Sequence, residues 1–316
     1  MKKLVSIIAL AAALGACETT GASSTDGVKA TATASTAAPA AAWKAKRGPD
    51  GVHPDLNGVW QVLNTANYNI EAHPAQSALQ LRPGPYVPVP AAGVVALGAV
   101  GAVPAGIGIV QGDGKIPYTA DALALRDENR AAAVDLDPEV KCYLPGIPRA
   151  NYMDKPFQIF HSDKAVFFAY EYAGAVRNVF LDDPGEAPVD SWMGQSYGKW
   201  DGDTFVIEVT GLLPDTWLDR SGNLHGSTTK VTERWTPTSD YTMRYEATIE
   251  DEEVYTKPWK IAFNLYKKVG EDAQLQQFKC VEFVEELMYG HLRKNPLPGP
   301  ALERAKREAE ERAKEQ

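Results

Sequence analysis

The chain has 316 residues and a formal net charge of −9, with 44% hydrophobic and 23% charged residues. The acidic balance argues against the basic surface that nucleic-acid binding requires, so no nucleic-acid partner is expected. The composition is that of a folded protein, and an uninterrupted body of roughly 240 residues can form one all-β domain.

The N-terminus has the pattern of a signal peptide. Lys2 and Lys3 precede an apolar run over residues 4–14, which is too short to cross a bilayer as a helix. The run ends in LGAC, residues 14–17, which resembles the lipobox of bacterial lipoproteins. The resemblance implies that residues 1–16 are removed and that Cys17 is acylated, which makes the lipid bilayer a partner. The alternative is a plain secretory signal with an incidental cysteine.

Residues 17–49 are predicted to connect the acylated Cys17 to the folded body. Their Ala, Thr, Ser and Gly content offers too little apolar surface to offset the entropy of ordering, which predicts a flexible tether. Glu18 stands where an aspartate is associated with retention in the inner membrane. The predicted location is therefore the cell envelope, at the periplasmic face of the outer membrane.

Residues 50–292 are predicted to form a single β-rich domain, an antiparallel meander arranged as a barrel or a sandwich. Apolar and polar residues alternate in its C-terminal half, as they do in half-buried strands. The strands are expected at 165–172, 204–210, 228–235, 241–249, 259–266 and 275–281. Near its start, Gly58, Val59 and Trp60 resemble the Gly-x-Trp signature of lipocalin-type barrels.

A few helices are predicted at the periphery. Residues 119–133 favour a helix with Thr119 as its N-cap, and residues 293–316 favour a charged helical tail. The uncharged segment 91–110 carries five glycines and Pro104, which weaken a helix. It is expected to form a loop or short strands on the body, with a membrane segment as the alternative.

Two cysteines remain once Cys17 is assigned to lipid. Cys142 and Cys280 form an even pair in an oxidising compartment, which predicts a disulfide bond. The alternative is two buried free thiols.

Longer motifs occur between residues 115 and 292. They read CYLPGIPR (142–149), YEYAGAVRNVF (170–180), SWMGQSYGKWDGDTFVIEV (191–209), TWLDRSGNLHG (216–226), VTERW (231–235) and IEDEEVYTKPW (249–259). Together they resemble an uncharacterised family of exported proteins and lipoproteins of Gram-negative bacteria. The resemblance implies export and an intact fold, and it brings no chemistry with it. Family members read PHS where this chain has Leu224, His225 and Gly226, so a serine nucleophile beside His225 is not expected.

The connection DTWLDRSGNLHG, residues 215–226, holds the side chains of a possible acid–base site. His225 is the candidate base, because an imidazole titrates near neutral pH. Asp219 is the candidate residue that orients it, and Asp215 is a second nearby carboxylate. The alternative is an ordinary turn, in which Asp219 caps the loop and His225 begins the next strand.

A second polar group surrounds the predicted hairpin turn at residues 173–174. Arg177 or Tyr170 would stabilise negative charge that develops on a substrate. Glu171 and Arg177 are expected to form a cross-strand ion pair. If the hairpin faces a barrel interior, this pair would be buried and would orient a polar group of a ligand.

Aromatic side chains in loops predict a ligand pocket. Trp192 and Trp217 lie beside glycine or charged residues, where aromatic rings often wall a binding site. Met193, Glu171 and Tyr172 complete the candidate ligand-binding set. The expected ligand is a small apolar or aromatic molecule.

No cofactor and no metal ion are predicted. The sequence lacks a P-loop, a dinucleotide-binding glycine motif, HExxH and CxxC, and the acidic run at 250–253 lacks EF-hand spacing. Two functions stay open. One is a lipid-anchored protein that binds a small apolar or aromatic molecule in a β-barrel or sandwich pocket. The other is a cofactor-free hydrolase, lyase or isomerase that uses His225 and Asp219.

Overall fold

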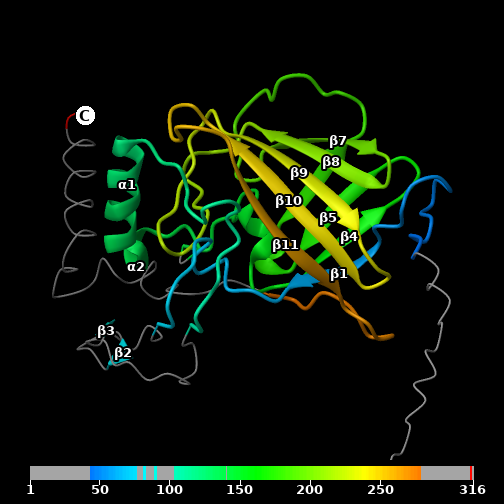
Figure 1. Ribbon diagram of the computed structural model, residues 1–316, viewed down its shortest axis with the longest axis horizontal. Coiled ribbons are helices and arrows are strands. Elements are labelled where there is room, and N and C mark those ends of the chain that lie inside the picture. The colour runs from blue at the N-terminus through cyan, green and yellow to red at the C-terminus, as the bar shows by residue number, and fades with distance from the viewer. Residues whose placement is uncertain are drawn as a thin grey trace, which may run out of the picture. The chain divides into compact units, whose positions relative to one another are not determined.

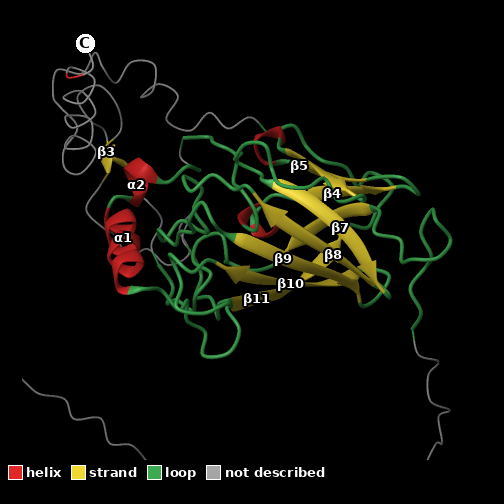
Figure 2. Ribbon diagram, turned by 90° about the horizontal axis from the view of Figure 1, so that it is seen from above, coloured by secondary structure: helices red, strands yellow, loops and turns green. Residues whose placement is uncertain are grey.

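The computed structural model describes residues 43–76, 81–82, 89–90, 103–139, 141–278 and 314. Within these residues nine strands form a closed barrel in the order β1–β11–β10–β9–β8–β7–β6–β5–β4, and β4 pairs back with β1 (Figures 1 and 2). The predicted all-β barrel is confirmed, and the sandwich is not formed. The strands are β1 (Gly58–Val62), β4 (Phe157–His161), β5 (Val166–Tyr170), β6 (Val176–Phe180), β7 (Gln195–Asp201), β8 (Thr204–Thr210), β9 (Lys230–Pro237), β10 (Thr242–Glu250) and β11 (Trp259–Lys267).

Smaller elements accompany the barrel. The short strands β2 (Leu81–Arg82) and β3 (Val89–Pro90) pair with each other. The helical pieces are α1 (Ala120–Ala131), α2 (Ala133–Leu136) and the 3₁₀ turns η1 (Arg149–Tyr152) and η2 (Tyr172–Gly174). The predicted cap of α1 is confirmed, because the Thr119 side chain accepts a hydrogen bond from the backbone N–H of Ala122.

Side-chain alternation explains most of the strands. Along β10, Met243, Tyr245, Ala247 and Ile249 are buried, and the residues between them are exposed or half-buried. The prediction for β8 matches its observed bounds, and those for β5, β9, β10 and β11 differ from the observed bounds by at most two residues. The strand predicted at 275–281 is wrong over residues 275–278, which form no strand; residues 279–281 lie outside the described chain.

One seam of the barrel departs from the predicted antiparallel meander. β6 and β7 run parallel and share two register pairs, Val179 with Ser196 and Phe180 with Tyr197. Parallel neighbours need a connection that carries the chain back along the sheet, and residues 181–194 provide it. Gly194 ends this connection at φ +65°, where a Cβ would lie 2.7 Å from the carbonyl oxygen of Thr210.

Aromatic rings occupy the barrel interior. The Trp235 ring lies 4.7 Å from that of Tyr245 and 5.2 Å from that of Phe168, measured between centroids. Trp60, in the Gly-x-Trp motif, pairs with both β4 and β11, so it marks the point where the barrel closes. Its indole N–H donates to the carbonyl of Leu56 at 3.0 Å. The interior is therefore a packed core along most of its length.

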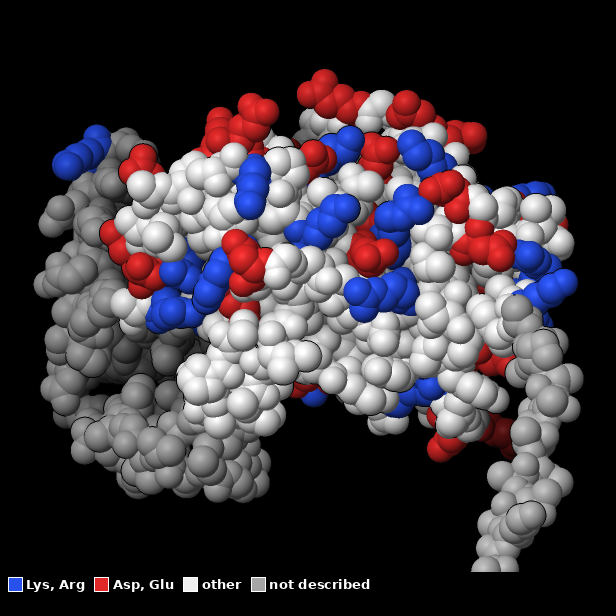
Figure 3. Space-filling model, viewed as in Figure 1, with Lys and Arg blue, Asp and Glu red and all other residues white. Residues whose placement is uncertain are grey.

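The outer face seen in Figure 3 carries charges of both signs. Glu208 on β8 accepts from Lys199 at 3.2 Å and from Lys230 at 3.0 Å, and Arg234 bonds Asp201 at 2.8 Å. These pairs join neighbouring strands, so opposite charges offset each other across β7, β8 and β9.

Residues 43–49, predicted as the end of the tether, contact one end of the barrel. The indole N–H of Trp43 donates to Asp240 at 3.1 Å, and Arg47 bonds Asp203 at 2.6 Å. His53 stacks on Trp200 with ring centroids 4.5 Å apart. This N-terminal arm, residues 43–55, therefore lies against the turns between β7 and β8 and between β9 and β10.

Several predictions fall outside the described residues and stay predictions. They concern the signal peptide 1–16, Cys17 and the tether up to residue 42, the helical tail except Lys314, and Cys280, so the disulfide with Cys142 is not placed. Of the segment 91–110, residues 103–110 are described and form isolated bridges to residues 76, 73 and 261. Among the described residues, no helix combines the length and the apolar character needed to cross a membrane.

Candidate functional site

His225 is buried inside the loop that joins β8 and β9. Its Nδ1 lies 2.9 Å from the carbonyl of Gly226, and its Nε2 bonds the hydroxyl of Thr216. A carbonyl can only accept, so Nδ1 carries the proton, and the single hydroxyl hydrogen of Thr216 has two acceptors, Nε2 and the carbonyl of Leu213 at 3.1 Å. Burial lowers the pKa of His225, which keeps the imidazole neutral. The side chain thus holds two parts of the loop together.

Asp219 does not contact His225, so the predicted pair is wrong. The Asp219 carboxylate is fully buried and accepts from the backbone N–H groups of Ile70 and Ser221 at 2.9 and 2.8 Å, and from Asn223 Nδ2 at 2.6 Å. Burial raises the pKa of Asp219, and these donors oppose that shift. The acid therefore caps its own loop and fastens it to the segment at residue 70, as the alternative interpretation expects.

The other residues of this connection have separate surroundings. Asp215 is exposed, whereas Trp217 is 7% exposed and forms a bridge with Leu224. The predicted acid–base residues are therefore not gathered around one substrate position.

Arg177 points into the barrel and pairs with Glu233 of β9, not with Glu171. Both side chains are buried, and Arg177 Nη2 bonds a Glu233 carboxylate oxygen. Arg177 Nε also donates to Ser196 Oγ at 2.7 Å, across the parallel seam between β6 and β7. Burial opposes the charge on Arg177, but Glu233 outweighs it and raises the pKa of the guanidinium.

Glu233 accepts further hydrogen bonds in the barrel interior. Tyr245 Oη donates to its Oε1 at 2.8 Å, and Asn151 Nδ2 does so at 2.7 Å. Tyr170 Oη in turn donates to Asn151 Oδ1 at 2.9 Å, and burial raises its pKa. Arg177 Nη1 has no hydrogen-bond partner among the described residues. The hypothesis that Arg177 or Tyr170 contacts a ligand therefore stays a prediction.

The serine on this seam, Ser196, is the central residue of a short sequence pattern. Residues 194–198 read GQSYG, which matches the G-x-S-x-G pattern of serine hydrolases. That chemistry needs the serine on a sharp turn between a strand and a helix, with its hydroxyl exposed. Ser196 is 1% exposed within β7 and bonded to Arg177, so it has no nucleophile geometry.

Glu171 and Tyr172 face other neighbours. The Glu171 carboxylate accepts from the backbone N–H of Gln276 at 2.8 Å, and Tyr172 Oη donates to the carbonyl of Glu139 at 3.1 Å. The predicted Glu171–Arg177 ion pair is wrong, because Arg177 faces the barrel interior while Glu171 faces the chain that follows β11.

Trp192 and Met193 lie in the connection between β6 and β7. Trp192 is half-buried, and its ring lies 5.0 Å from that of Tyr143. Met193 is buried in the core. The ligand-binding role of Trp192, Met193, Trp217, Glu171 and Tyr172 stays a prediction, and none of these residues lines the pocket described below.

A second buried ionic cluster was not anticipated. Arg149 bonds Asp137 at 3.0 Å and Glu139 at 2.7 Å, and Arg220 bonds the same Glu139 at 2.6 Å. Burial disfavours the charge on Glu139, but Arg220 and Arg149 outweigh it and lower its pKa. This cluster links the chain after α2, the turn η1 and the loop before β9, so its evident role is to fix three loops.

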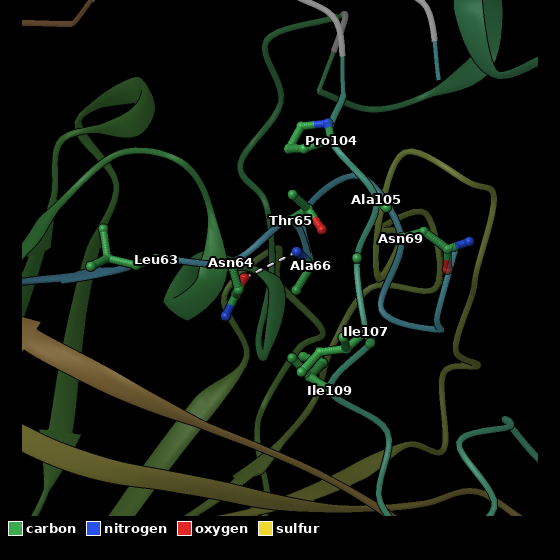
Figure 4. A pocket seen from close by; sticks show the side chains of 11 residues that line it. Leu63, Asn64, Thr65, Ala66, Asn69, Pro104, Ala105, Ile107 and Ile109 are labelled. Atoms are coloured by element: carbon green, nitrogen blue, oxygen red, sulfur yellow. Dashed lines mark hydrogen bonds between the residues drawn. The ribbon is translucent and has the colours of Figure 1, made fainter. Parts of the chain in front are cut away.

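The pocket lies beyond the end of β1, outside the barrel wall. Residues from two loops, 63–69 and 104–109, line an open pocket of about 360 Å³ (Figure 4). Its lining includes the apolar side chains of Leu63, Ala66, Pro104, Ala105, Ile107 and Ile109. The polar lining side chains are Asn64, Thr65 and Asn69, and none of the lining residues is charged.

The rim of this pocket is unusually apolar for a surface. Ile107 is 98% exposed and Leu63 is 71% exposed. Exposed aliphatic side chains beside a concave, uncharged site are typical of a place that binds an apolar molecule.

Glycines let the two pocket loops approach each other. A Cβ on Gly106 would overlap Thr65 Oγ1 and lie 2.5 Å from His73 Nε2. Gly108 has φ +78°, and a Cβ there would lie 2.6 Å from the backbone nitrogen of Ala72. The glycine-rich character of this segment is therefore a requirement of close packing at the pocket.

Within the described residues, no group of three or more His, Cys, Asp or Glu side chains has the arrangement of a metal site. No protein-family model, curated protein or solved structure matches the chain. The site must therefore be interpreted from its own geometry.

We expect the buried neutral His225 to make stability depend on pH. Its pKa is lower in the folded chain than the unfolded value of 6.5, so its contribution is full above pH 6.5. Below pH 6.5 His225 binds a proton in the unfolded chain and stays unprotonated in the folded chain. The free energy of unfolding therefore falls by up to about 1.4 kcal/mol per pH unit. Urea unfolding at pH 7.5 and 5.5 should show a smaller fall in His225→Gln. An equal fall in both proteins would contradict this.

We expect Arg177→Met to lower the free energy of unfolding by about 3–5 kcal/mol, because it leaves Glu233 charged and unpaired in the core. Adding Glu233→Gln should restore part of this loss, since the amide oxygen still accepts from Tyr245 and Asn151. The exposed pair offers the matched control, and Arg234→Met should cost less than about 1 kcal/mol. Urea unfolding measures these losses. If the double variant loses as much free energy of unfolding as the two single variants together, the charges of Arg177 and Glu233 do not interact.

Proposed function

We propose that the protein is a lipid-anchored binding protein of the cell envelope that holds a small, uncharged, largely apolar molecule. The observation that carries the proposal is the pocket of about 360 Å³ between residues 63–69 and 104–109, with its exposed aliphatic rim. Its volume lies within the range that small-ligand sites occupy.

The proposed place differs from the sequence-based hypothesis, which expected a barrel or sandwich pocket lined by Trp192, Met193, Trp217, Glu171 and Tyr172. Aromatic rings and the Arg177–Glu233 pair occupy the interior, and side chains such as Trp235 and Phe168 are fully buried there. The lateral pocket instead presents accessible apolar surface, which is what an apolar ligand needs.

The alternative of an acid–base enzyme loses its specific support. His225 and Asp219 each have protein partners, and the neutral His225 has its two ring nitrogens engaged. A general base needs a free nitrogen within reach of a substrate proton.

The envelope location is supported by the sequence of residues 1–17, with its charged start, short apolar run and LGAC end. Acyl chains on Cys17 would hold the protein at a membrane, because more than one chain gives stable anchoring.

We expect Cys17→Ser to carry no acyl groups and to keep residues 1–16, because the lipobox resemblance makes both acylation and removal of these residues depend on Cys17. Mass spectrometry of the wild-type N-terminus should find acyl groups on Cys17 and no residues 1–16. A wild-type protein that begins before Cys17, or that carries an unmodified thiol there, would contradict the anchor.

We expect naphthalene, an uncharged ring system without hydrogen-bonding groups, to bind saturably at one site. Ile107→Asp should weaken binding about tenfold, because it replaces apolar contact with charge at the rim. Val176→Asp provides the control, since Val176 is exposed at 56% on the outer barrel wall and does not line the pocket. Fluorescence titration measures both. Equal affinities in the two variants would locate the site elsewhere.

A further inference from the structure

The hydrogen bonds around the pocket show which of its polar side chains can donate a hydrogen bond to a ligand and which can accept one. Asn64 Oδ1 accepts from the backbone N–H of Ala66 at 3.0 Å, the bond drawn in Figure 4. Asn69 Oδ1 accepts from the backbone N–H of Glu71 at 2.9 Å. A backbone N–H can only donate, so both amide oxygens are identified and occupied, and the amides have NH₂ donors left to offer.

Thr65 offers an acceptor to a ligand and not a donor, and its bond to His73 is the reason. His73 Nδ1 lies 3.1 Å from the carbonyl of Pro74, which can only accept, so in the tautomer with one ring hydrogen that hydrogen is on Nδ1. His73 Nε2 then has a lone pair, and it lies 3.0 Å from Thr65 Oγ1. The Thr65 hydroxyl must therefore donate to His73, and its own lone pairs are left to accept.

The surroundings hold this arrangement in place. His73 is 7% exposed, and its backbone N–H and carbonyl both pair with Gly106, at 2.9 and 3.0 Å. Gly106 leaves room for the Thr65–His73 bond, which any Cβ at that position would displace. Two backbone bonds thus fix the main chain at His73, and the ring contacts the carbonyl of Pro74 and the Tyr68 ring, whose centroid lies 5.5 Å away.

We propose that His73 is the specificity-determining residue of the pocket: it fixes Thr65 as a hydrogen-bond acceptor, so the favoured ligand is an uncharged apolar molecule that carries a hydroxyl or N–H donor. This inference rests on the proposed binding function and adds the polarity of the ligand to it. An apolar molecule that can only accept at this position meets lone pairs at Thr65 and gains no bond there. The amide of Asn64 can still donate to an oxygen of either kind of ligand.

Phenol and anisole test the inference, because they share a ring and an oxygen, and anisole has a methyl group where phenol has the hydrogen of its O–H donor. The protein is the full chain carrying Cys17→Ser, and binding is followed by amide NMR shifts of Ala66 and Gly106. Phenol should bind about fivefold more tightly than anisole, as one neutral hydrogen bond provides. Thr65→Val should reduce phenol affinity to that of anisole and leave anisole unchanged.

His73→Phe separates positioning from direct contact. It removes the acceptor that holds the Thr65 hydroxyl, so the hydroxyl can turn and donate to anisole, and the preference for phenol should fall toward onefold while both probes still bind. His53→Phe is the matched control, because His53 stacks on Trp200 at the other end of the barrel and its ring contact is preserved. This control should keep the fivefold preference.

The outcomes separate the two proposals. Equal binding of phenol and anisole to the unsubstituted pocket, or an unchanged preference in His73→Phe, overturns the role of His73 and leaves the binding function standing. Shifts at Ala66 and Gly106 that do not saturate with either probe overturn both.

Discussion

The ion pair between Arg177 and Glu233 is the interaction on which the barrel interior depends. Two opposite charges can stay buried among aromatic rings only if each satisfies the other and neighbouring groups complete their hydrogen bonds. Ser196, Tyr245 and Asn151 supply bonds of this kind from β7, β10 and η1, and Arg177 Nη1 alone has no partner among the described atoms of the pair. The pair therefore joins four strands and a 3₁₀ turn, including the seam where β6 and β7 share two register pairs.

The alternation of apolar and polar residues along the strands indicates that both members of this pair are buried. Glu233 shares a strand face with Val231 and Trp235, and Arg177 lies between Ala175 and Val179. A charge on an apolar face needs a partner, but period-two patterning cannot say which of several strands provides it. Local alternation likewise predicted β8 to β11 well, whereas the parallel β6–β7 seam and the closure through Trp60 are set by long-range pairing.

The candidate site also depends on long-range contacts that a local sequence pattern cannot identify. The sequence pattern predicts that the loop with Asp219 and His225 joins two strands, and the loop does lie between β8 and β9. Their partners are Ile70, Asn223 and Thr216, so the loop uses its acid and imidazole to fix itself. The pocket was missed because it depends on how closely the glycines of residues 106 and 108 approach residues 65–73, a distance that composition does not encode.

The two ends of β1 have different neighbours. Before Gly58, the arm that begins at Trp43 lies against the turn at Asp240; after Val62, the chain enters the pocket loop at Leu63. One strand of five residues therefore carries the chain directly from the arm to the pocket loop, so the positions of both are tied to the point where the barrel closes.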